Sequence, residues 1–355
     1  MNASADTIAG LPRLLGYRMP AEWEPHAATW LTWPRRDGIS FPGGFKAIPD
    51  IWARMVALLA PGEEVHINTY DAAQRRSIVA LLKKHGLGKL LDRRIYLHPF
   101  PAYEPWCRDH GPIFVKGPKG LAVVDWIYNA WGGKYPPFEL DDAVAGKVAT
   151  HLGMPRFTPP LVLEGGSIDV DGAGNLLTTS ACLLNPNRNP QLAQTQIEAA
   201  LRDYLGVENI LWLGDGIAGD DTDGHVDGIA RFVAPGTVLA AVEDYPEDAN
   251  YGVLQANLAL LRKMRGAGGK KLKVRPLPMP GPVEWKGERM PASYANFYVG
   301  NEVVLLPVFD DPNDERAARI LAECFPSRRI EPILARELIN GLGAFHCVTQ
   351  QQPAG

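Results

Sequence analysis

Residues 225–242 read HVDGIARFVAPGTVLAAV, and this stretch contains two β-rich runs joined by a Pro-Gly turn. Such a pattern predicts a β-hairpin. Three more pairs of β-rich runs with a Gly-containing turn occur at residues 111–128, 166–180 and 292–309. A stretch with an apolar stripe at helical spacing follows each pair. These predicted helices cover residues 141–152, 191–205, 249–265 and 313–325.

The hairpins recur at intervals of about 60 residues, which favours a ring of small α/β modules over unrelated elements. The β-rich runs at residues 28–33 and 345–350 are left unpaired by this scheme. We expect them to pair and to complete a fifth unit. A ring closed by its two ends makes residues 1–355 one catalytic domain, although length alone favours two. The alternative is a plain α/β sandwich whose βα units happen to recur.

The composition excludes several classes of protein. With 36 Lys+Arg, 40 Asp+Glu and a net charge of −4, the chain lacks the basic balance of a nucleic-acid protein. Four scattered cysteines do not make a disulfide scaffold. No apolar run approaches the roughly 20 residues of a membrane span. The N-terminus, MNASADTIAGLPRLLG, lacks the pattern of a signal peptide, so the expected location is the cytoplasm.

Polar side chains gather at the starts of the predicted hairpins. The set consists of Asp109, Glu164, Asp220, Asp221, Asp223, His225, Asp227 and, on the expected closing strand, Cys347. In a ring of modules these positions face a common centre. His225 and Asp227, two apart on an expected strand, point to the same face. Either residue taken alone fits a structural role as well as a catalytic one.

A thiol, an imidazole and several carboxylates suit a planar cationic electrophile. Carboxylates hold a guanidinium through its in-plane N–H groups, a thiolate attacks its central carbon, and a histidine transfers the protons. Metal chemistry is the competing hypothesis, but CxxC and HExxH are absent from the sequence. Nucleotide-binding glycine loops and GxSxG are also absent. The other cysteines are Cys107, close to Asp109, and Cys182 and Cys324, both in apolar surroundings.

Long segments of the chain resemble the agmatine deiminase and bacterial-type peptidyl-arginine deiminase family of the guanidino-group-modifying superfamily. The matching segments are MPAEWEPHAATWLTWP (19–34), WCRDHGP (106–112), NAWGGKY (129–135), LEGGSIDVDGAGNLLTTSACLLNPNRNP (163–190), DDTDGHVDGIARF (220–232), ASYANFYVGNEVVLLPVF (292–309) and HCVTQQQP (346–353). They span almost the whole chain in family order, and their co-occurrence is very specific.

The resemblance implies a pentein-like, five-bladed α/β propeller of ββαβ modules and hydrolysis of a guanidino group to a ureido group plus ammonia. It implies that Cys347 is the nucleophile, that His225 is the general acid/base, and that Glu164 orients His225. Asp109 and Asp227 would hold the guanidinium, and Asp221 matches a further acidic position. It implies no cofactor and no metal, because calcium dependence belongs to the animal branch.

The substrate's tail is left open by the sequence. Agmatine on the route to putrescine is the first hypothesis; arginine or peptidyl-arginine is the second, and transfer of the amidino group to an amine shares the intermediate. A non-catalytic guanidine- or polyamine-binding protein is a remote alternative, since it would lack the nucleophile or the base. The segments RRDGISFPGGF (35–45) and GLGAFHC (341–347) depart from the family pattern where a tail could be read. Trp33, Trp106 and Trp131 are candidates for the pocket walls or for ordinary core. We expect a small cationic guanidino substrate, no nucleic acid and no membrane, and the sequence allows a homo-oligomer.

Overall fold

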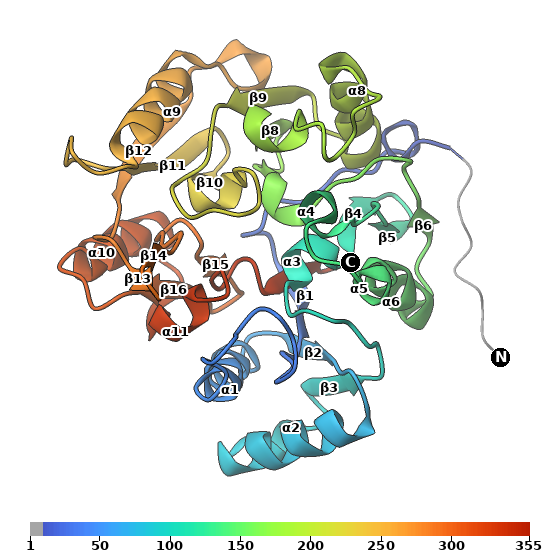
Figure 1. Cartoon of the computed structure of the whole chain (residues 1–355). Helices are drawn as coiled ribbons and strands as arrows, with labels where there is room; N and C mark the ends of the chain where they lie inside the picture. The colour runs from blue at the N-terminus through green and yellow to red at the C-terminus, as the bar shows by residue number, and fades with distance from the viewer. Residues whose placement is uncertain (1–9) are drawn as a thin grey trace.

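The computed structural model describes residues 10–355. Residues 1–9, which begin the segment that lacks the pattern of a signal peptide, lie outside this range. Within residues 10–355, six helices have eight or more residues. They lie towards the periphery in Figure 1. They are α1 (Ile48–Leu59), α2 (Ala72–Lys84), α6 (Val144–Leu152), α8 (Gln194–Leu205), α9 (Tyr251–Lys263) and α10 (Asp314–Cys324). Short helices are α3 (Cys107–His110), α4 (Ala130–Gly133), α5 (Glu139–Asp142), α7 (Ser180–Leu183) and α11 (Arg336–Ile339).

All four predicted hairpins are present, each followed by a helix and a parallel third strand. The first three strands of this set are β4 (Ile113–Gly117), β5 (Gly120–Val124) and β6 (Arg156–Phe157). The next two sheets are β7 (Asp169–Val170), β8 (Asn175–Thr179) and β9 (Asn209–Leu213), then β10 (Ala230–Ala234), β11 (Thr237–Val242) and β12 (Lys273–Pro278). The fourth consists of β15 (Tyr298–Val299), β16 (Val303–Val308) and β17 (Arg329–Leu334).

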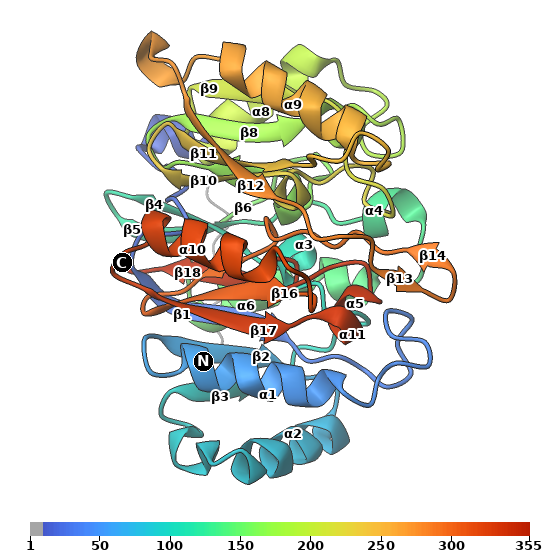
Figure 2. The ribbon, with the colours of Figure 1, turned by 90° about the vertical axis from the view of Figure 1, so that its left-hand side faces the viewer.

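The pairing of the two ends of the chain is also confirmed. Strand β1 (His26–Thr32) lies antiparallel to β18 (Thr349–Pro353), with Trp30 opposite Gln350. The strands β2 (Glu64–Asn68) and β3 (Ile95–His98) extend this sheet in the order β18-β1-β2-β3. A separate hairpin, β13 (Glu284–Trp285) and β14 (Glu288–Arg289), projects from the side of the molecule in Figure 2. The architecture is therefore mixed α/β.

The predicted apolar stripes of the helices form the core. Ile197, Leu201 and Leu205 on α8 are fully buried, because positions i, i+4 and i+8 share one helix face. On α10, Ala317 and Leu321 are buried while Ile320 and Cys324 are half-buried. Among residues 10–355, no helix has the length and the apolar character needed to cross a bilayer.

Candidate active site

Two cavities lie at Cys347, which lines both of them. The outer cavity has a volume of about 320 Å³. Its lining includes Trp106, Asp109, Trp131, Tyr135 and Asp221. The inner one, of about 30 Å³, is lined by His225, Asp227 and Asn296. The sequence-predicted thiol, imidazole and two of the carboxylates therefore come together, although they lie up to 238 positions apart between Asp109 and Cys347.

Cys347 lies in a tight turn, held by the side chain of Asn296. Asn296 Oδ1 accepts hydrogen bonds from the backbone N–H of Ala344 (3.1 Å) and of Cys347 (3.3 Å), and its Nδ2 lies 3.1 Å from the Cys347 Sγ. The expected closing strand at residues 345–350 is wrong in its boundary. Strand β18 begins only at Thr349, because residues 344–348 turn around Asn296 and place the thiol in the cavity.

Burial raises the pKa of the Cys347 thiol well above its ordinary value, and the Asp227 and Asp109 carboxylates raise it further. The thiol is therefore protonated at neutral pH. Two other cysteines, Cys107 and Cys182, are fully buried, and burial also raises the pKa of each. Cys347 differs from these two because it lines the cavities.

His225 and Asp227 were expected on a strand, and this is wrong. His225 directly precedes a 3₁₀ helix, η4 (Val226–Gly228), and strand β10 starts only at Ala230. The two side chains nevertheless converge on Gly166, in the 3₁₀ helix η3 (Gly165–Ser167). A Cβ on Gly166 would lie 2.5 Å from His225 Nδ1 and 3.1 Å from Asp227 Oδ2. The close approach of η3 and η4 thus needs a glycine at this position.

Asp109 is placed by α3 and aimed by two donors. Its Oδ2 accepts from Trp131 Nε1 (3.1 Å), and its Oδ1 accepts from the backbone N–H of Gly166 (3.0 Å). Ala130 and Trp131 have φ values of 52° and 54°, a left-handed conformation that is unfavourable for side chains of their size. With this backbone conformation the Trp131 indole lies within hydrogen-bond distance of Asp109. Burial raises the pKa of Asp109 to about 6, with the nearby Asp227 and Glu164 carboxylates adding to this effect.

Glu164 lies behind His225 and is completely buried. Arg188 Nε donates to Glu164 Oε1 at 2.7 Å, and Arg188 Nη1 contacts Asp223 Oδ2 at 2.5 Å. Burial alone would lower the pKa of His225, but the Asp109, Glu164 and Asp227 carboxylates raise it above its ordinary value. Both ring nitrogens of His225 are buried and have no hydrogen-bond partner among residues 10–355. The neighbouring carboxylates therefore favour the imidazolium form of His225.

One group of residues has the composition of a metal site. Ligand atoms of Glu164, Cys182 and His225 lie within 4.8 Å of one another. The Arg188 guanidinium already pairs with Glu164, and the raised pKa of Cys182 keeps its sulfur protonated. Both effects oppose the binding of a cation, which needs deprotonated ligands.

The predicted wall residues separate into two groups. Trp106 and Trp131 line the outer cavity. Trp33 does not line either hollow; it packs in the core, and its backbone N–H donates to Asn68 O at 3.0 Å. Asp221 lines the cavity but already contacts the Tyr135 hydroxyl and, at 3.5 Å, Lys134 Nζ.

The mouth of the outer cavity is formed by residues 39–42 and the β13–β14 hairpin. Glu104 accepts from the backbone N–H groups of Ile39 (3.0 Å) and Ser40 (3.1 Å), and from the Ser40 hydroxyl. On the other side, Lys286 Nζ donates to Pro42 O at 3.2 Å. These contacts tie together two segments that the sequence places 244 positions apart.

The sequence analysis missed Asn296 and Arg188, although both lie in segments that carry the resemblance. The available signal was an amide within the otherwise apolar run YANFYV (294–299), and a lone cation within the turn NPNRNP (185–190). Neither signal predicts which residue the side chain contacts, because Asn296 hydrogen-bonds to a loop about 50 residues away in the sequence.

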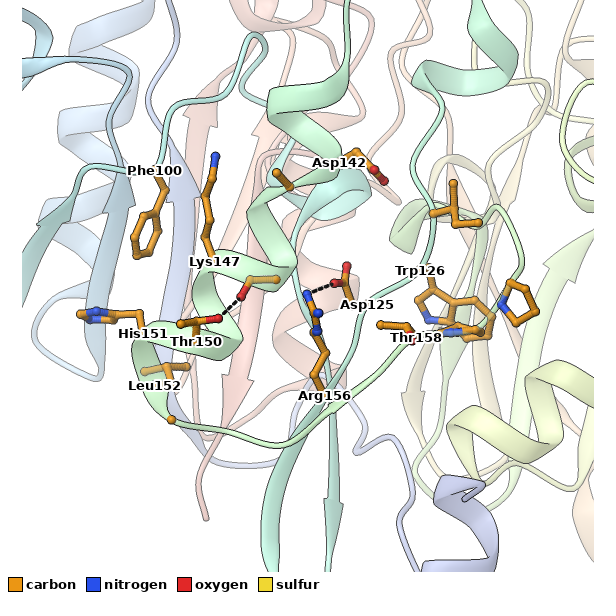
Figure 3. Close-up of a pocket in the computed structure, with 16 residues that line it drawn as sticks. Phe100, Asp125, Trp126, Asp142, Lys147, Thr150, His151, Leu152, Arg156 and Thr158 are labelled. Carbon is orange, nitrogen blue, oxygen red and sulfur yellow. Dashed lines mark hydrogen bonds and ion pairs between the residues drawn. The ribbon is translucent and has the colours of Figure 1, made fainter. Parts of the chain in front are cut away.

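A larger cavity, of about 1140 Å³, lies elsewhere and contains none of the predicted site residues. It is lined by residues of α6 and β6 such as Lys147, His151 and Arg156, and the Arg156 guanidinium pairs with Asp125 at 3.1 Å (Figure 3). Size therefore does not identify the active site here; the convergence of titratable groups does.

Comparisons with known proteins agree with this geometry. The model of the Porphyromonas-type peptidyl-arginine deiminase family matches residues 18–353. The chain is 40% identical to an agmatine deiminase of Ectopseudomonas mendocina, with 98% of each chain covered. It is 41% identical to an agmatine deiminase of Pseudomonas aeruginosa, with 97% of each covered. A solved agmatine deiminase of Enterococcus faecalis superposes with a TM-score of 0.90 at 33% identity, covering 98% of this chain and 99% of that one. The chain therefore belongs to the Porphyromonas-type peptidyl-arginine deiminase family.

Proposed function

We propose that the protein is an enzyme that hydrolyses agmatine to N-carbamoylputrescine and ammonia, a reaction on the route to putrescine. The observation that carries the proposal is that the Asp109 carboxylate in the outer cavity and the His225 imidazole and Asp227 carboxylate in the inner cavity all lie around the Cys347 thiol, which lines both cavities. Relatives named agmatine deiminase match almost the whole chain at about 40% identity.

The substrate is held by charge and shape. A guanidinium is planar, permanently charged and rich in N–H donors, so Asp109 and Asp227 bind it through hydrogen bonds that also offset its burial. Trp106 and Trp131 flank the same cavity and confine the flat group. The cation lowers the pKa of the Cys347 thiol by direct attraction to the thiolate, and the thiol proton leaves to solvent.

The chemistry then proceeds in two halves. The Cys347 thiolate attacks the central guanidino carbon, His225 gives its proton to a terminal nitrogen, the C–N bond breaks, and ammonia leaves an amidino-cysteine. Water next adds to the same carbon and gives one proton to neutral His225. The C–S bond then breaks, the second water proton goes to solvent, and the ureido product leaves with the thiolate restored.

Glu164 supports the proton transfers made by His225. The carboxylate raises the pKa of His225, and its own position is set by Arg188. We infer that Glu164 keeps the imidazole charged for the first half and able to recover its proton in the second.

The tail of the substrate decides between agmatine and arginine or peptidyl-arginine. A carboxylate-bearing tail needs a free cation at the mouth. Lys134 is paired with Asp221 and Asp223, and Lys286 donates to Pro42 O, while Glu288 also lines the mouth. This arrangement favours a tail that ends in an amine. We infer that Asp221 contributes to binding there.

The fold proposal is a five-bladed α/β propeller in which residues 1–355 form one catalytic domain. Its support is the repetition of β-β-α-β units and the pairing of β1 with β18 across the two ends of the chain. We further propose that the protein works in the cytoplasm on a small cationic substrate, without nucleic acid or membrane as partners, and that it can form a homo-oligomer.

The test is release of ammonia and ureido product with agmatine, free arginine and a peptide ending in arginine, measured in parallel. We expect turnover of agmatine in preference to the other two. Cys347→Ala should abolish turnover and leave agmatine binding detectable by calorimetry, because the carboxylates remain. Turnover by Cys347→Ala would refute the mechanism, and preference for a carboxylate-bearing substrate would refute the assignment of agmatine.

A further inference from the structure

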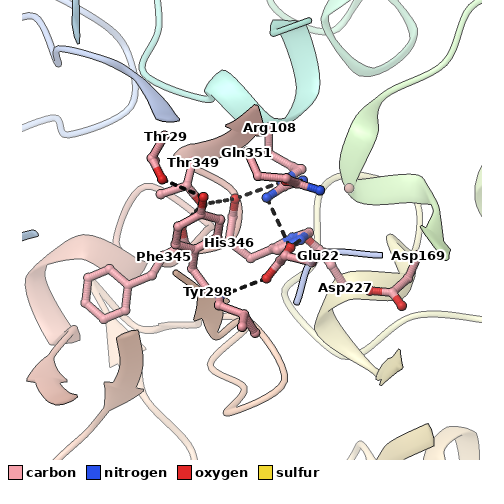
Figure 4. A network of polar contacts seen from close by, with 12 residues as sticks. Glu22, Thr29, Arg108, Asp169, Asp227, Tyr298, Phe345, His346, Thr349 and Gln351 are labelled. Atoms are coloured by element: carbon pink, nitrogen blue, oxygen red, sulfur yellow. Dashed lines mark hydrogen bonds and ion pairs between the residues drawn. The ribbon is translucent and has the colours of Figure 1, made fainter. Parts of the chain in front are cut away.

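A second set of buried charges lies directly behind the nucleophile. It consists of Glu22 from the segment before β1, Arg108 on α3, Arg231 on β10, and His346, the neighbour of Cys347. Figure 4 shows Glu22, Arg108 and His346 together with Asp227. Glu22 Oε2 lies 2.9 Å from Arg231 Nη2 and 3.3 Å from Arg108 Nη2, and its Oε1 accepts from the backbone N–H of Val299 at 2.8 Å. None of these contacts belongs to the reaction described above.

His346 lies between two carboxylates. Its Nδ1 is 2.7 Å from Asp227 Oδ2, and its Nε2 is 2.9 Å from Glu22 Oε2. An ionised carboxylate only accepts hydrogen bonds, and a neutral imidazole has a single N–H. Two such hydrogen bonds therefore require the imidazolium form. The pKa values of Glu22 and Asp227 support this: burial raises each, but neighbouring cations, His346 among them, lower both below the ordinary value.

One oxygen connects this imidazolium to the reaction centre. Asp227 Oδ2, the acceptor for His346 Nδ1, is also 3.6 Å from Cys347 Sγ. The carboxylate of Asp227 is thus fixed from behind while its front faces the nucleophile. Arg108 also holds the backbone of this turn. Its side-chain Nε donates to the carbonyl of His346 at 3.3 Å, and its backbone N–H donates to the carbonyl of Cys347 at 3.1 Å.

Asp109 provides a comparison within the same site. Among residues 10–355 it accepts only from a neutral indole and a backbone N–H, and His225 Nδ1 lies 3.8 Å from its Oδ1. Its pKa is raised to about 6, whereas that of Asp227 is lowered although both side chains are buried. The difference follows from the direct contact that His346 makes with Asp227.

We propose that His346 is a positioning residue of the deimination reaction: held as an imidazolium by Glu22, it keeps Asp227 ionised and aimed at the substrate guanidinium. His346 does not touch the substrate and acts only through Asp227. The inference rests on the proposed function, since it concerns how the guanidinium is captured.

The test compares pH profiles of kcat and kcat/KM for agmatine in the full-length protein and in His346→Asn. Asparagine retains a donor near the position of Nδ1 but carries no charge, so the hydrogen bond to Asp227 can persist while the cation is lost. We expect Asp227 to take up a proton more readily. The acidic limb of kcat/KM that Asp227 contributes lies below the step set by Asp109, and it should move up by about one pH unit, or about tenfold at a fixed acidic pH below that step. At alkaline pH, kcat should approach that of the wild type.

A second variant and a control keep the result interpretable. Glu22→Gln removes the charge that holds the imidazolium and should shift the limb in the same direction, even if His346→Asn fails to fold. His85→Asn is the matched control, because His85 also contacts a carboxylate, Asp50 at 2.7 Å, far from the site in the chain and partly exposed. The groups around His346 whose titration bears on the profile are Glu22, Asp227, Asp169, Arg108 and Arg231.

The outcomes separate the two proposals. If the wild type releases no ammonia from agmatine, the proposed function fails. If the wild type is active and the profiles of both variants superpose on it, the role of His346 is overturned. A loss of kcat that is equal at every pH, with an unmoved acidic limb, also overturns it, because this is the signature of a merely structural residue.

Discussion

Gly166→Ala adds one methyl group at the point where the site residues converge. The new Cβ would lie 2.5 Å from His225 Nδ1, 2.8 Å from Asp109 Oδ1 and 3.1 Å from Asp227 Oδ2. Carbon and nitrogen do not approach to 2.5 Å without a bond. The imidazole must therefore withdraw by about 0.9 Å to restore an ordinary contact of roughly 3.4 Å.

The magnitude follows from that displacement. A misplacement of about 1 Å at a reacting group costs roughly 100-fold in rate, so we expect kcat/KM for agmatine to fall about 100-fold or more. Overpacking in a buried position costs about 1–3 kcal/mol, which for a chain of this length lowers Tm by only about 1–4 °C. Activity should therefore be lost in a protein that remains folded.

The assay is ureido-product formation at saturating and limiting agmatine, with Tm measured on the same samples. Gly252→Ala is the matched control, since Gly252 lies in the first turn of α9 and a Cβ there meets nothing within 4 Å. It should leave both kcat/KM and Tm undiminished. If Gly166→Ala retained kcat/KM within a few-fold of the wild type, the close convergence of His225, Asp109 and Asp227 would be refuted.

Three further predictions concern pH and loop support. Because burial raises the pKa of Asp109 to about 6, kcat/KM of the wild type should fall as the pH drops through about 6, when protonation removes a charge that faces the guanidinium; a flat profile down to about pH 5 would contradict this. Burial lowers the pKa of His66 to about 4 and of His98 to about 3, so both stay neutral in the fold while the unfolded chain takes up protons below about pH 6.5. The contribution of these histidines to the free energy of unfolding is therefore fully present above about pH 6.5 and is lost as the pH falls towards 4. His98→Gln should reduce the acid-induced drop in Tm. An equal drop in the variant would exclude the histidines as its cause. Asn296→Ala should lower kcat and cost about 1–3 kcal/mol in urea unfolding, because the N–H groups of Ala344 and Cys347 lose their acceptor; an unchanged kcat would show that the Cys347 turn needs no such support.

The recurrence of hairpin and helix is a local property, and the sequence therefore predicts it well. Alternating β-rich runs around Gly and Pro turns locate the hairpins, and the 3.6-residue period of Ile197, Leu201 and Leu205 locates a helix face. The pairing of β1 with β18 follows from the same pattern, because two strands remained without partners. The motifs of the family resemblance likewise contain the thiol, the imidazole and the carboxylates, so the sequence predicts these groups directly.

The spatial arrangement of those groups depends on contacts between distant parts of the chain. Predictions made from local spacing alone were therefore wrong. His225 and Asp227 were assigned to a strand from their spacing, yet they converge through a 3₁₀ helix, because η3 and η4 approach closely at Gly166. Trp33 resembles Trp106 and Trp131 in the sequence, but only the last two reach the cavity. A periodic pattern records which face of an element is buried; it does not record what that face meets.

The sequence by itself therefore predicted the β-hairpins with their following helices, the family and the candidate reactive side chains of this protein. The tertiary structure alone decided which carboxyl group has a lowered pKa and which has a raised one. Asp109 and Asp227 are the same residue type, and both are buried. One accepts from neutral donors and the other from His346, 119 residues away, and their pKa values shift in opposite directions. The physical reason is that a pKa depends on charges within a few ångströms in space, and folding brings those charges together from distant parts of the chain.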